Sequence, residues 1–337
     1  MTERLIVGID GGNSKTDVVL ATSSGALLGW LRTTGSNPQG IGLAATNRLI
    51  RTALDALLAS ARRPGTELSV LSLCMAGIDT PRDAEAVRGA LRLRGERRIA
   101  RRIATRNDSE AGLRVATEDG VGIALVGGAG VNAIGVNERG VDARFAALGD
   151  ISGDFGGGGG LAVAGIGAAV RAEERRGPRT RLGKAILAST GHRSLRELLD
   201  AILDGTFDQA QIGALAAVVL AQSERGDDVA RAIERRMIEH AVAFATAAQI
   251  RAPIRRRPVP IVLIGGTLNA PFPGYQRRLR AALRASLPPI DVRPLRTAPA
   301  LGALLYALDA AEPRLPRRRS AEADLRAAFR RARPRSA

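Results

Sequence analysis

The sequence contains one cysteine, Cys74, and two histidines, His192 and His240. A lone cysteine excludes a disulfide within the chain and a cluster ligated by cysteines of a single copy. The histidines lie far apart and in different contexts, so we interpret both as incidental and not as a metal-binding pair. Aromatic residues make up 3% of the chain, which disfavours a surface on which single-stranded nucleic acid stacks.

The chain also lacks long apolar runs and is poor in lysine. No apolar run approaches the roughly 18 residues of a transmembrane helix, and the N-terminus enters a strand without a signal-peptide pattern. We therefore expect a cytoplasmic protein with no membrane association. Of the 50 basic residues, only Lys15 and Lys184 are lysine. The formal charge of +17 thus reflects a general preference for arginine, and we expect no specific nucleic-acid partner.

The stretch from Leu5 to Leu20, LIVGIDGGNSKTDVVL, is the most informative part of the chain. It predicts a strand, a glycine-rich turn and a second strand. Because a strand follows the turn, the pattern is neither a Walker A loop nor a dinucleotide fingerprint, both of which open a helix. An ordinary Gly-Asn turn is the alternative. The candidate phosphate ligands are Gly11, Gly12, Ser14, Lys15 and Thr16, with the Asp10 carboxylate at the end of the first strand.

The same pattern returns in residues 121–145. Gly128 lies 117 residues after Gly11, and Gly140 lies 115 residues after Gly25. A near-constant offset between two strand–turn–strand–turn–strand units predicts an internal duplication, with chance similarity of two meanders as the alternative. Two such units would face each other across a cleft, each offering backbone amides to one polyphosphate.

Polar residues follow several predicted strands. Asp108 comes after a short strand and at the start of a helix, where it is either an available carboxylate or an N-cap. Asp150 and Asp154 either hold a substrate hydroxyl or a hydrated metal, or cap turns. Gly156 to Gly160 lead into a helix whose first amides we expect to be exposed to the ligand. Paired glycines after the strand VPIVLI would let a flat ring lie against the backbone, and residues beyond about 312 predict a solvated or partly helical tail.

Together these motifs resemble the BadF/BadG/BcrA/BcrD-type ATPase family of the sugar kinase, Hsp70 and actin superfamily, in its N-acetylglucosamine kinase-like branch. The resemblance covers about residues 4–308 and rests on the order DGGNSKT, AGID, ND, GGAGVN, GDISGDFGGGGG, GPRT and IGGTLNA. It implies an α/β fold of two ribonuclease H-like (actin-like ATPase) domains around a nucleotide cleft. The expected boundaries are 1–117, 118–311 with a helical insertion, and a basic tail at 312–337.

The resemblance also implies ATP and Mg²⁺ as cofactors, a small-molecule sugar as substrate and a homodimer. Asp108 would be the base that accepts the proton of the sugar 6-hydroxyl, and Asp10 would orient hydrated Mg²⁺. Residues implied at the nucleotide are Asp10, Gly11, Gly12, Ser14, Lys15, Thr16, Gly128, Gly130, Gly265, Gly266 and Asn269. Residues implied at the sugar are Asn37, Gly77, Asn107, Asn132 and Asp150.

Two motifs depart from the pattern of these kinases. The chain has Gly-Ala-Gly-Val at 128–131 in place of Gly-Thr-Gly-Ser, and Gly-Asp-Ile-Ser at 149–152 in place of Gly-Asp-Glu-Gly. The substrate therefore stays open among N-acetylglucosamine, other amino sugars and other hydroxyl compounds. One rival is an ATPase that drives a partner protein, although the cysteine motif of the electron-transferring activators is absent. Another is a non-catalytic nucleotide-binding regulator.

Overall fold

The computed structural model describes residues 4–94 and 97–336, and the chain forms two compact units. Unit 1 consists of residues 1–120 and 296–337, and unit 2 of residues 121–295. This division differs from the boundaries expected from the sequence. After residues 121–295, which form unit 2, the chain returns to unit 1. Residues 296–311 therefore belong with the N-terminal strands and not with the strands of unit 2 that precede them.

Unit 1 contains a six-stranded sheet in the order β13-β3-β2-β1-β4-β7. Strands β1, β2 and β3 form the predicted antiparallel meander, while β4 and β7 extend the sheet parallel to β1. The strands are β1 (Leu5–Gly11), β2 (Lys15–Thr22), β3 (Leu27–Thr34), β4 (Leu68–Met75), β7 (Ala100–Asn107) and β13 (Arg335–Ser336), and a separate small hairpin comprises β5 (Leu93–Arg94) and β6 (Arg97–Arg98).

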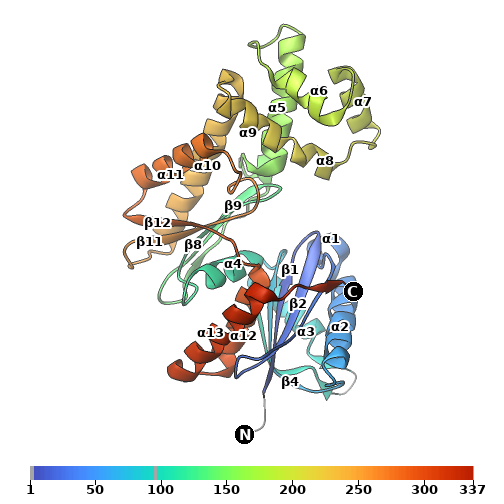
Figure 1. Cartoon of the computed structure of the whole chain (residues 1–337), viewed down its shortest axis with the longest axis vertical. Coiled ribbons are helices and arrows are strands. Elements are labelled where there is room, and N and C mark those ends of the chain that lie inside the picture. Colours follow the sequence, from blue (N-terminus) through green and yellow to red (C-terminus); the bar gives the residue numbers. More distant parts are fainter. Residues whose placement is uncertain (1–3, 95–96, 337) are drawn as a thin grey trace. The chain divides into compact units, whose positions relative to one another are not determined.

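Helices cover both faces of this sheet (Figure 1). On one face, α2 (Leu43–Ser60) and α3 (Pro81–Ala90) pack on the apolar residues of β1 and β4. On the other, α4 (Asp108–Ala116) and α12 (Pro299–Ala311) pack around Cys74. A Cβ at Gly8 would lie 2.2 Å from the Leu304 backbone nitrogen, so the missing side chain lets α12 approach β1 closely. The short α1 (Pro38–Ile41) precedes α2.

Unit 2 repeats this sheet. Its strand order is β10-β9-β8-β11-β12, and the directions match those of β3-β2-β1-β4-β7, with an antiparallel meander extended by two parallel strands. The predicted duplication is therefore confirmed at the level of the fold. The strands are β8 (Gly122–Gly127), β9 (Val131–Val136), β10 (Asp142–Ala143), β11 (Val259–Ile264) and β12 (Ile290–Pro294).

The helices of unit 2 form two groups. The long α10 (Asp228–Arg251) and α11 (Pro273–Ser286) bury Met237, Ala241 and Leu279 in the core that includes β8 and β11. The predicted helical insertion has a second core of its own, in which residues such as Leu182 and Leu198 pack together. It comprises α5 (Gly157–Glu173), α6 (Leu182–Thr190), α7 (Leu195–Leu203), α8 (Gln209–Ala214) and α9 (Ala216–Glu224), preceded by the 3₁₀ turn η1 (Gly149–Ile151).

The C-terminal segment is partly helical, which is one of the two predicted states, but it is packed and not solvated. Helix α13 (Leu315–Arg331) buries Ala321, Leu325 and Phe329, which recur every four residues on one face. The Phe329 ring lies 4.7 Å from that of Trp30. The spacing of these apolar residues was not recognised in the sequence, because arginines occupy many of the other positions of the helix.

A buried arginine ties α13 to the rest of unit 1. The side chain of Arg114, on α4, is 1% exposed and donates to both Asp309 and Glu322. The two carboxylates raise the pKa of Arg114 and more than offset its burial. Asp309 lies on α12 and Glu322 on α13, so one guanidinium joins three helices.

We expect Leu325→Ala to destabilise the protein by about 2–5 kcal/mol, the usual cost of emptying a fully buried leucine site. Leu325 is 0% exposed. Leu315→Ala, on the same helix but at a position 55% exposed, is the matched control and should change stability by about 0.5 kcal/mol or less. Denaturant unfolding monitored by circular dichroism measures both. Equal, small effects would show that α13 does not pack as described.

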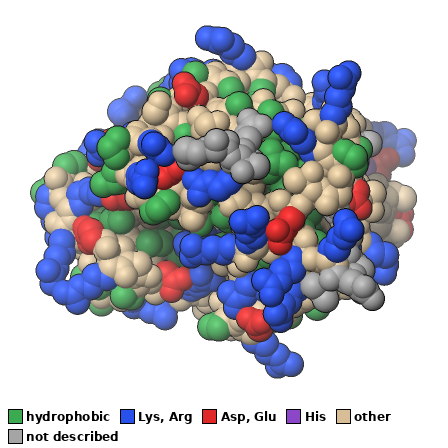
Figure 2. Space-filling model, turned by 90° about the horizontal axis from the view of Figure 1, so that it is seen from below, with side chains coloured by type: hydrophobic (Ala, Val, Ile, Leu, Met, Phe, Trp, Pro, Cys, Tyr) green, Lys and Arg blue, Asp and Glu red, His purple; other side chains and the backbone are tan. Residues whose placement is uncertain are grey.

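Charged side chains are spread over the surface. Figure 2 shows one face on which basic side chains are interspersed with acidic and hydrophobic ones. Several arginines form ion pairs with neighbouring carboxylates, as Arg144 does with Asp142 and Arg293 with Asp291. Within residues 4–94 and 97–336, no helix combines the length and apolar character needed to cross a bilayer.

Candidate active site

The site in unit 1 lies where three parallel strands end. Gly11 of β1 pairs with Met75 of β4, and Met75 pairs with Asn107 of β7. The three strand ends are therefore in register at one edge of the sheet. Asp10 and Asp108, which the sequence places far apart, come to this same edge because the parallel pairing brings their strand ends together.

The predicted glycine turn connects β1 to β2 at this edge. It is closed by a hydrogen bond from the Gly12 amide to the Lys15 carbonyl, at 2.9 Å. Ser14 and Lys15 are exposed on it, so their side chains are available to a ligand. The Thr16 hydroxyl is buried without a hydrogen-bond partner, so it does not reach the surface of the turn.

Asp10 is a buried carboxylate whose negative charge is only partly offset by nearby cations. It is 9% exposed and accepts no hydrogen bond from the described part of the chain. Burial is the main reason that its pKa rises from 3.8 to about 7, and the carboxylates of Asp108 and Asp17 raise it further. Lys15 and Arg32 oppose the rise without cancelling it. Such a group is stabilised by any cation that binds beside it.

Asp17, which the sequence did not single out, has the opposite environment. It is fully buried but accepts hydrogen bonds from Trp30 Nε1 at 2.9 Å and from Arg32 Nε and Nη2 at 2.8 and 2.9 Å. Lys15 Nζ lies 3.8 Å from Asp17 Oδ2. Asp17 thereby anchors the start of β2 and positions Lys15 at the turn. A carboxylate inside the otherwise apolar strand TDVVLAT was the available signal.

Asp108 is the first residue of α4 and not its cap. Asn107 takes the cap position, with its side-chain oxygen accepting from the Ser109 amide at 3.0 Å. The Asp108 carboxylate is therefore left available, with a 3.4 Å contact from the Ser109 hydroxyl. Burial raises the pKa of Asp108, the nearby Asp79 carboxylate adds to this, and the hydrogen bonds from Ser109 oppose it. A raised pKa makes this carboxylate a better proton acceptor.

A chain of side-chain hydrogen bonds links the loops around this edge. Asn37 donates to Asn13 Oδ1 at 2.6 Å, Gln39 donates to Asp79 at 3.1 Å, and Asn107 donates to Asp79 at 3.0 Å. Asn13, Gln39 and Asp79 were missed, although Asp79 lies only four residues beyond Met75, the last residue of the buried strand β4. The structure thus brings the predicted Asn37 and Asn107 to one surface with Asp108's helix.

Gly77 belongs to the same surface, and its backbone conformation requires a glycine. Its φ is +78°, and a Cβ there would lie 2.1 Å from the Asn37 Oδ1 atom. A side chain at this position would therefore be strained and would displace Asn37. Gly77 shapes the surface by letting the two loops approach each other.

In unit 2, the turn between β8 and β9 corresponds to the first glycine turn. Gly128 and Gly130 are exposed on it. The carbonyls of Gly128 and Ala129 accept from the amides of Gly158 and Gly159 at 2.7 and 2.9 Å. These first-turn amides of α5 are therefore not free for a ligand, contrary to our expectation. The carbonyls of the duplicated turn accept hydrogen bonds from two amides that the run of glycines would otherwise have left exposed.

An apolar pocket of about 640 Å³ lies beside this turn. Its walls come from the turn itself, from α8 and α9, and from the segment after β11. The lining residues are Gly128, Ala129, Gly158, Gly159, Gln209, Ala210, Gly213, Ala214, Ala216, Ala217, Leu220, Gly266, Thr267, Ala270, Pro271 and Phe272. Such a pocket has the size and apolar character of a small-molecule site.

The predicted Gly266 lines this pocket, and the predicted Gly265 and Asn269 hold the segment that carries it. Gly265 has a φ of +90°, and a Cβ there would lie 2.3 Å from the Gly127 carbonyl, so only glycine lets β11 end against the turn. Asn269 Nδ2 donates to the carbonyls of Leu263 and Gly265 at 2.9 and 3.0 Å. The Asn269 amide group therefore holds this segment in place.

A second pocket, of about 390 Å³, is also lined by residues of this turn. Gly130, Asp150, Asp154, Val131 and Arg236 are among its lining residues. Asp150 is exposed, and Asp154 accepts a hydrogen bond from the Ser152 hydroxyl. The predicted Asn132 is partly buried, and its side-chain oxygen accepts from the Ala133 amide at 2.7 Å.

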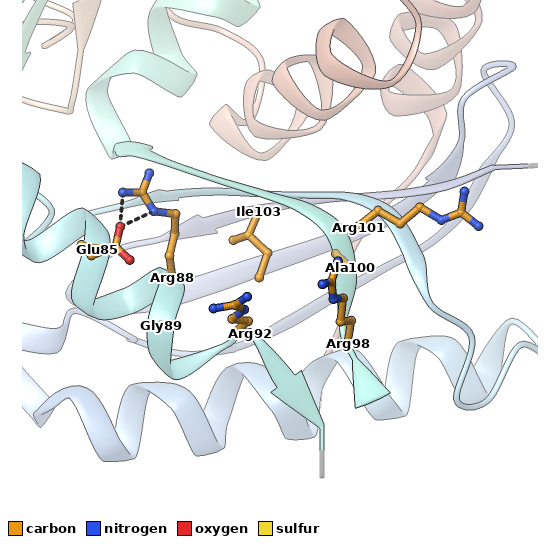
Figure 3. Close-up of a pocket in the computed structure, with 8 residues that line it drawn as sticks. All are labelled: Glu85, Arg88, Gly89, Arg92, Arg98, Ala100, Arg101 and Ile103. Carbon is orange, nitrogen blue, oxygen red and sulfur yellow. Dashed lines mark hydrogen bonds and ion pairs between the residues drawn. The ribbon is translucent and has the colours of Figure 1, made fainter. Parts of the chain in front are cut away.

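A third pocket lies in unit 1 at the other end of β7 and does not belong to this site (Figure 3). It is lined by Arg88, Arg92, Arg98 and Arg101, and Figure 3 shows Arg88 held by Glu85. The pocket includes Ala100, which lies eight residues before Asp108. At about 3.3 Å per residue in a strand, the two ends are about 26 Å apart.

The model of the BadF/BadG/BcrA/BcrD ATPase family matches residues 7–307. The chain belongs to this family. The family of ATPases predicted from the order of the motifs is thereby confirmed.

Two proteins similar in sequence to this chain are kinases. An N-acetylmuramic acid/N-acetylglucosamine kinase from Clostridium acetobutylicum is 25% identical over 90% of this chain and 98% of the relative. An N-acetyl-D-glucosamine kinase from Dictyostelium discoideum is 25% identical over 69% of this chain and 75% of the relative. They confirm the predicted class of ATP-dependent phosphotransferase.

The fold agrees with that of a solved structure. A candidate N-acetylglucosamine kinase from Chromobacterium violaceum superposes with a TM-score of 0.64 at 24% identity, covering 90% of this chain and 98% of the other. The predicted α/β fold of the actin-like ATPases is confirmed by this match and by the two equivalent sheets.

Proposed function

We propose that this family member transfers the γ-phosphate of ATP to the 6-hydroxyl of N-acetylglucosamine or a related amino sugar, with Asp108 as the general base. The observation that supports this most directly is the shared sheet edge of Asp10, the glycine turn and Asp108. The turn that would hold phosphate follows β1, and the Asp108 carboxylate of raised pKa follows β7, so the two lie at one sheet edge with the end of β4 between them. Phosphoryl transfer needs positioning and charge neutralisation above all, and these residues offer both.

Asp10 and the glycine turn fit Mg²⁺ and the terminal phosphates of ATP. The Asp10 carboxylate is buried and accepts no hydrogen bond from the described residues, and its pKa is raised to about 7. A hydrated Mg²⁺ held there would neutralise phosphate charge. The Gly11 and Gly12 backbone, Ser14 and Lys15 would bind phosphate oxygens. Thr16 would contribute through its backbone, because its hydroxyl is buried.

The apolar pocket of unit 2 fits the adenine ring. Gly128 and Gly266 present bare backbone on which a flat ring can lie, and Phe272 and Leu220 add apolar wall. Gly265 and Asn269 hold this wall in place and would act as positioning residues.

The remaining polar residues fit a sugar. Asn37 and Asn107 belong to the hydrogen-bonded chain at the edge that carries Asp108, while Gly77 shapes that surface. Asn132 and Asp150, in unit 2, would add contacts to the sugar. Asp150 is exposed in the second pocket, where a carboxylate is suited to accepting hydrogen bonds from sugar hydroxyls.

The experiment that tests this function is a coupled assay of ADP release with Mg-ATP against a panel of sugars. We expect release that depends on N-acetylglucosamine or N-acetylmuramic acid, with ³¹P NMR showing phosphate on the 6-hydroxyl. The 6-deoxy analogue is the matched control and should not support release. Slow release that no sugar alters would favour an ATPase that drives a partner protein, and no release at all would favour a nucleotide-binding regulator.

Cytoplasmic location stays a prediction from the sequence pattern, and a homodimer stays a prediction from the family resemblance. Sedimentation of the purified chain tests the second. A single species with the mass of one chain at micromolar concentration would contradict it.

A further inference from the structure

Arg236 is the basic residue in the lining of the second pocket of unit 2. Asp150 and Asp154 supply carboxylates to the same lining, and Val131 and Val163 supply apolar wall. The pocket therefore offers acceptors for hydroxyl groups, a surface for an alkyl group and one guanidinium. The proposed sugar contacts use the first of these but leave Arg236 without a role.

Arg236 is held in place by stacking. Its Cζ atom lies 4.1 Å from the centroid of the Phe155 ring, and Phe155 is 8% exposed. The Phe155 amide donates to His240 Nδ1 at 3.3 Å, so Phe155 is fixed by the next turn of the helix that carries Arg236. His240, which we interpreted as incidental, thus has a structural contact. Stacking uses the face of the guanidinium and leaves the N–H groups on its edge free to donate.

These donors have no partner in the described part of the chain. Arg236 makes no hydrogen bond or ion pair there, even though Asp150 and Asp154 line the same pocket. By contrast, its neighbour Arg235 lies outside the pocket lining and pairs with Glu239 at 3.9 Å. A stacked guanidinium with a free edge matches the geometry of a carboxylate, which can accept two parallel hydrogen bonds.

We propose that Arg236 selects amino sugars that carry a carboxylate on a short alkyl arm over neutral amino sugars. The inference rests on the proposed function, because it takes the pocket of Asp150 as part of the sugar site. In this arrangement Asp150 accepts from sugar hydroxyls, Val131 and Val163 contact the arm, and Arg236 donates to the carboxylate.

The test compares N-acetylmuramic acid, which carries a carboxylate on its 3-O-lactyl arm, with the corresponding carboxamide. For the wild-type chain we expect kcat/KM to favour the acid by about ten- to a hundredfold, the range of one charge-assisted pair. Arg236→Gln should reduce this ratio to about one, and Arg236→Lys should retain part of it. Arg235→Gln is the matched control and should leave the ratio unchanged. Calorimetric titration of the acid without ATP gives a second readout that does not depend on turnover.

The outcomes separate the two proposals. If N-acetylglucosamine is phosphorylated but the acid has no advantage over its carboxamide, the selectivity is overturned and the kinase stands. An equal loss of selectivity in Arg235→Gln would point to the general charge of α10 and would also overturn it. If no sugar supports ADP release, the proposed function fails. The selectivity then fails with it unless the titration shows Arg236-dependent binding of the acid.

Discussion

Asp108→Asn is expected to lower kcat by about two to four orders of magnitude, the usual contribution of a positioned general base, while the affinity for ATP stays within a few-fold. The substitution keeps the size and polarity of the side chain, so the packing at the start of α4 is preserved. It removes the basic oxygen that would accept the proton of the attacking hydroxyl. Coupled ADP release measures kcat, and equilibrium titration with a non-hydrolysable ATP analogue measures affinity.

The raised pKa of Asp108 adds a pH signature to this prediction. Because burial favours the protonated form, the fraction of enzyme with an ionised base falls as the pH falls below that raised value. Wild-type kcat/KM should therefore decline on the acid side at a higher pH than an ordinary aspartate would give. The residual activity of Asp108→Asn should lack this dependence on Asp108.

Glu85→Gln is the matched control for Asp108→Asn. Glu85 is a carboxylate of unit 1 that is 72% exposed and paired with Arg88, and an exposed pair contributes about 1 kcal/mol or less. Its removal should leave turnover near that of the wild type. Near-full activity in Asp108→Asn would mean that another group accepts the proton.

The strands and their ends could be predicted from the sequence because the relevant signals are local. Runs such as LIVGID and VPIVLI are too apolar and too short for anything but buried strands. Gly25 and Gly140 both have positive φ. Each lies in the turn between the second and third strands of its meander. Once the strands are known, parallel pairing brings Asp10 and Asp108 to one edge without further information.

The parts that escaped prediction depend on partners far away in the sequence. Asp17 is satisfied by Trp30 and Arg32 from the next strand. Helix α13 is held in place in part by the hydrogen bond from Arg114, about 200 residues earlier, to Glu322. The amides of Gly158 and Gly159 are occupied by the carbonyls of a turn some thirty residues before them. No local pattern reports such pairings, since each partner alone is compatible with an exposed position.

Asp10→Asn is expected to abolish turnover, by at least about a hundredfold, and at the same time to stabilise the metal-free protein at neutral and alkaline pH. The first effect follows from the loss of the carboxylate that would orient hydrated Mg²⁺. The second follows from burial. Since Asp10 is 9% exposed and accepts no hydrogen bond within the described residues, its ionised form destabilises the fold, and asparagine carries no charge.

The sign of the pH dependence follows from the raised pKa. The native state holds the Asp10 proton up to about pH 7, whereas the unfolded chain releases it near 3.8. Across that window the native state binds one proton more, so this group's contribution to wild-type stability falls as the pH rises. At about 1.4 kcal/mol for each pH unit, Asp10→Asn should gain stability on the order of a few kcal/mol at pH 8. Near pH 4 the gain should vanish.

Asp17→Asn is the control that makes this result specific. Asp17 is 0% exposed, against 9% for Asp10, but it accepts hydrogen bonds from both Trp30 and Arg32. Its neutralisation should therefore destabilise the protein by about 3–5 kcal/mol, the cost of breaking a buried pair. Denaturant unfolding at pH 4 and pH 8 with a chelator present measures both variants. If Asp10→Asn were no more stable than the wild type at pH 8, Asp10 would have a stabilising partner. If Asp10 lowers the stability of the fold, its presence is explained by what it binds and not by packing, because functional residues often lower stability.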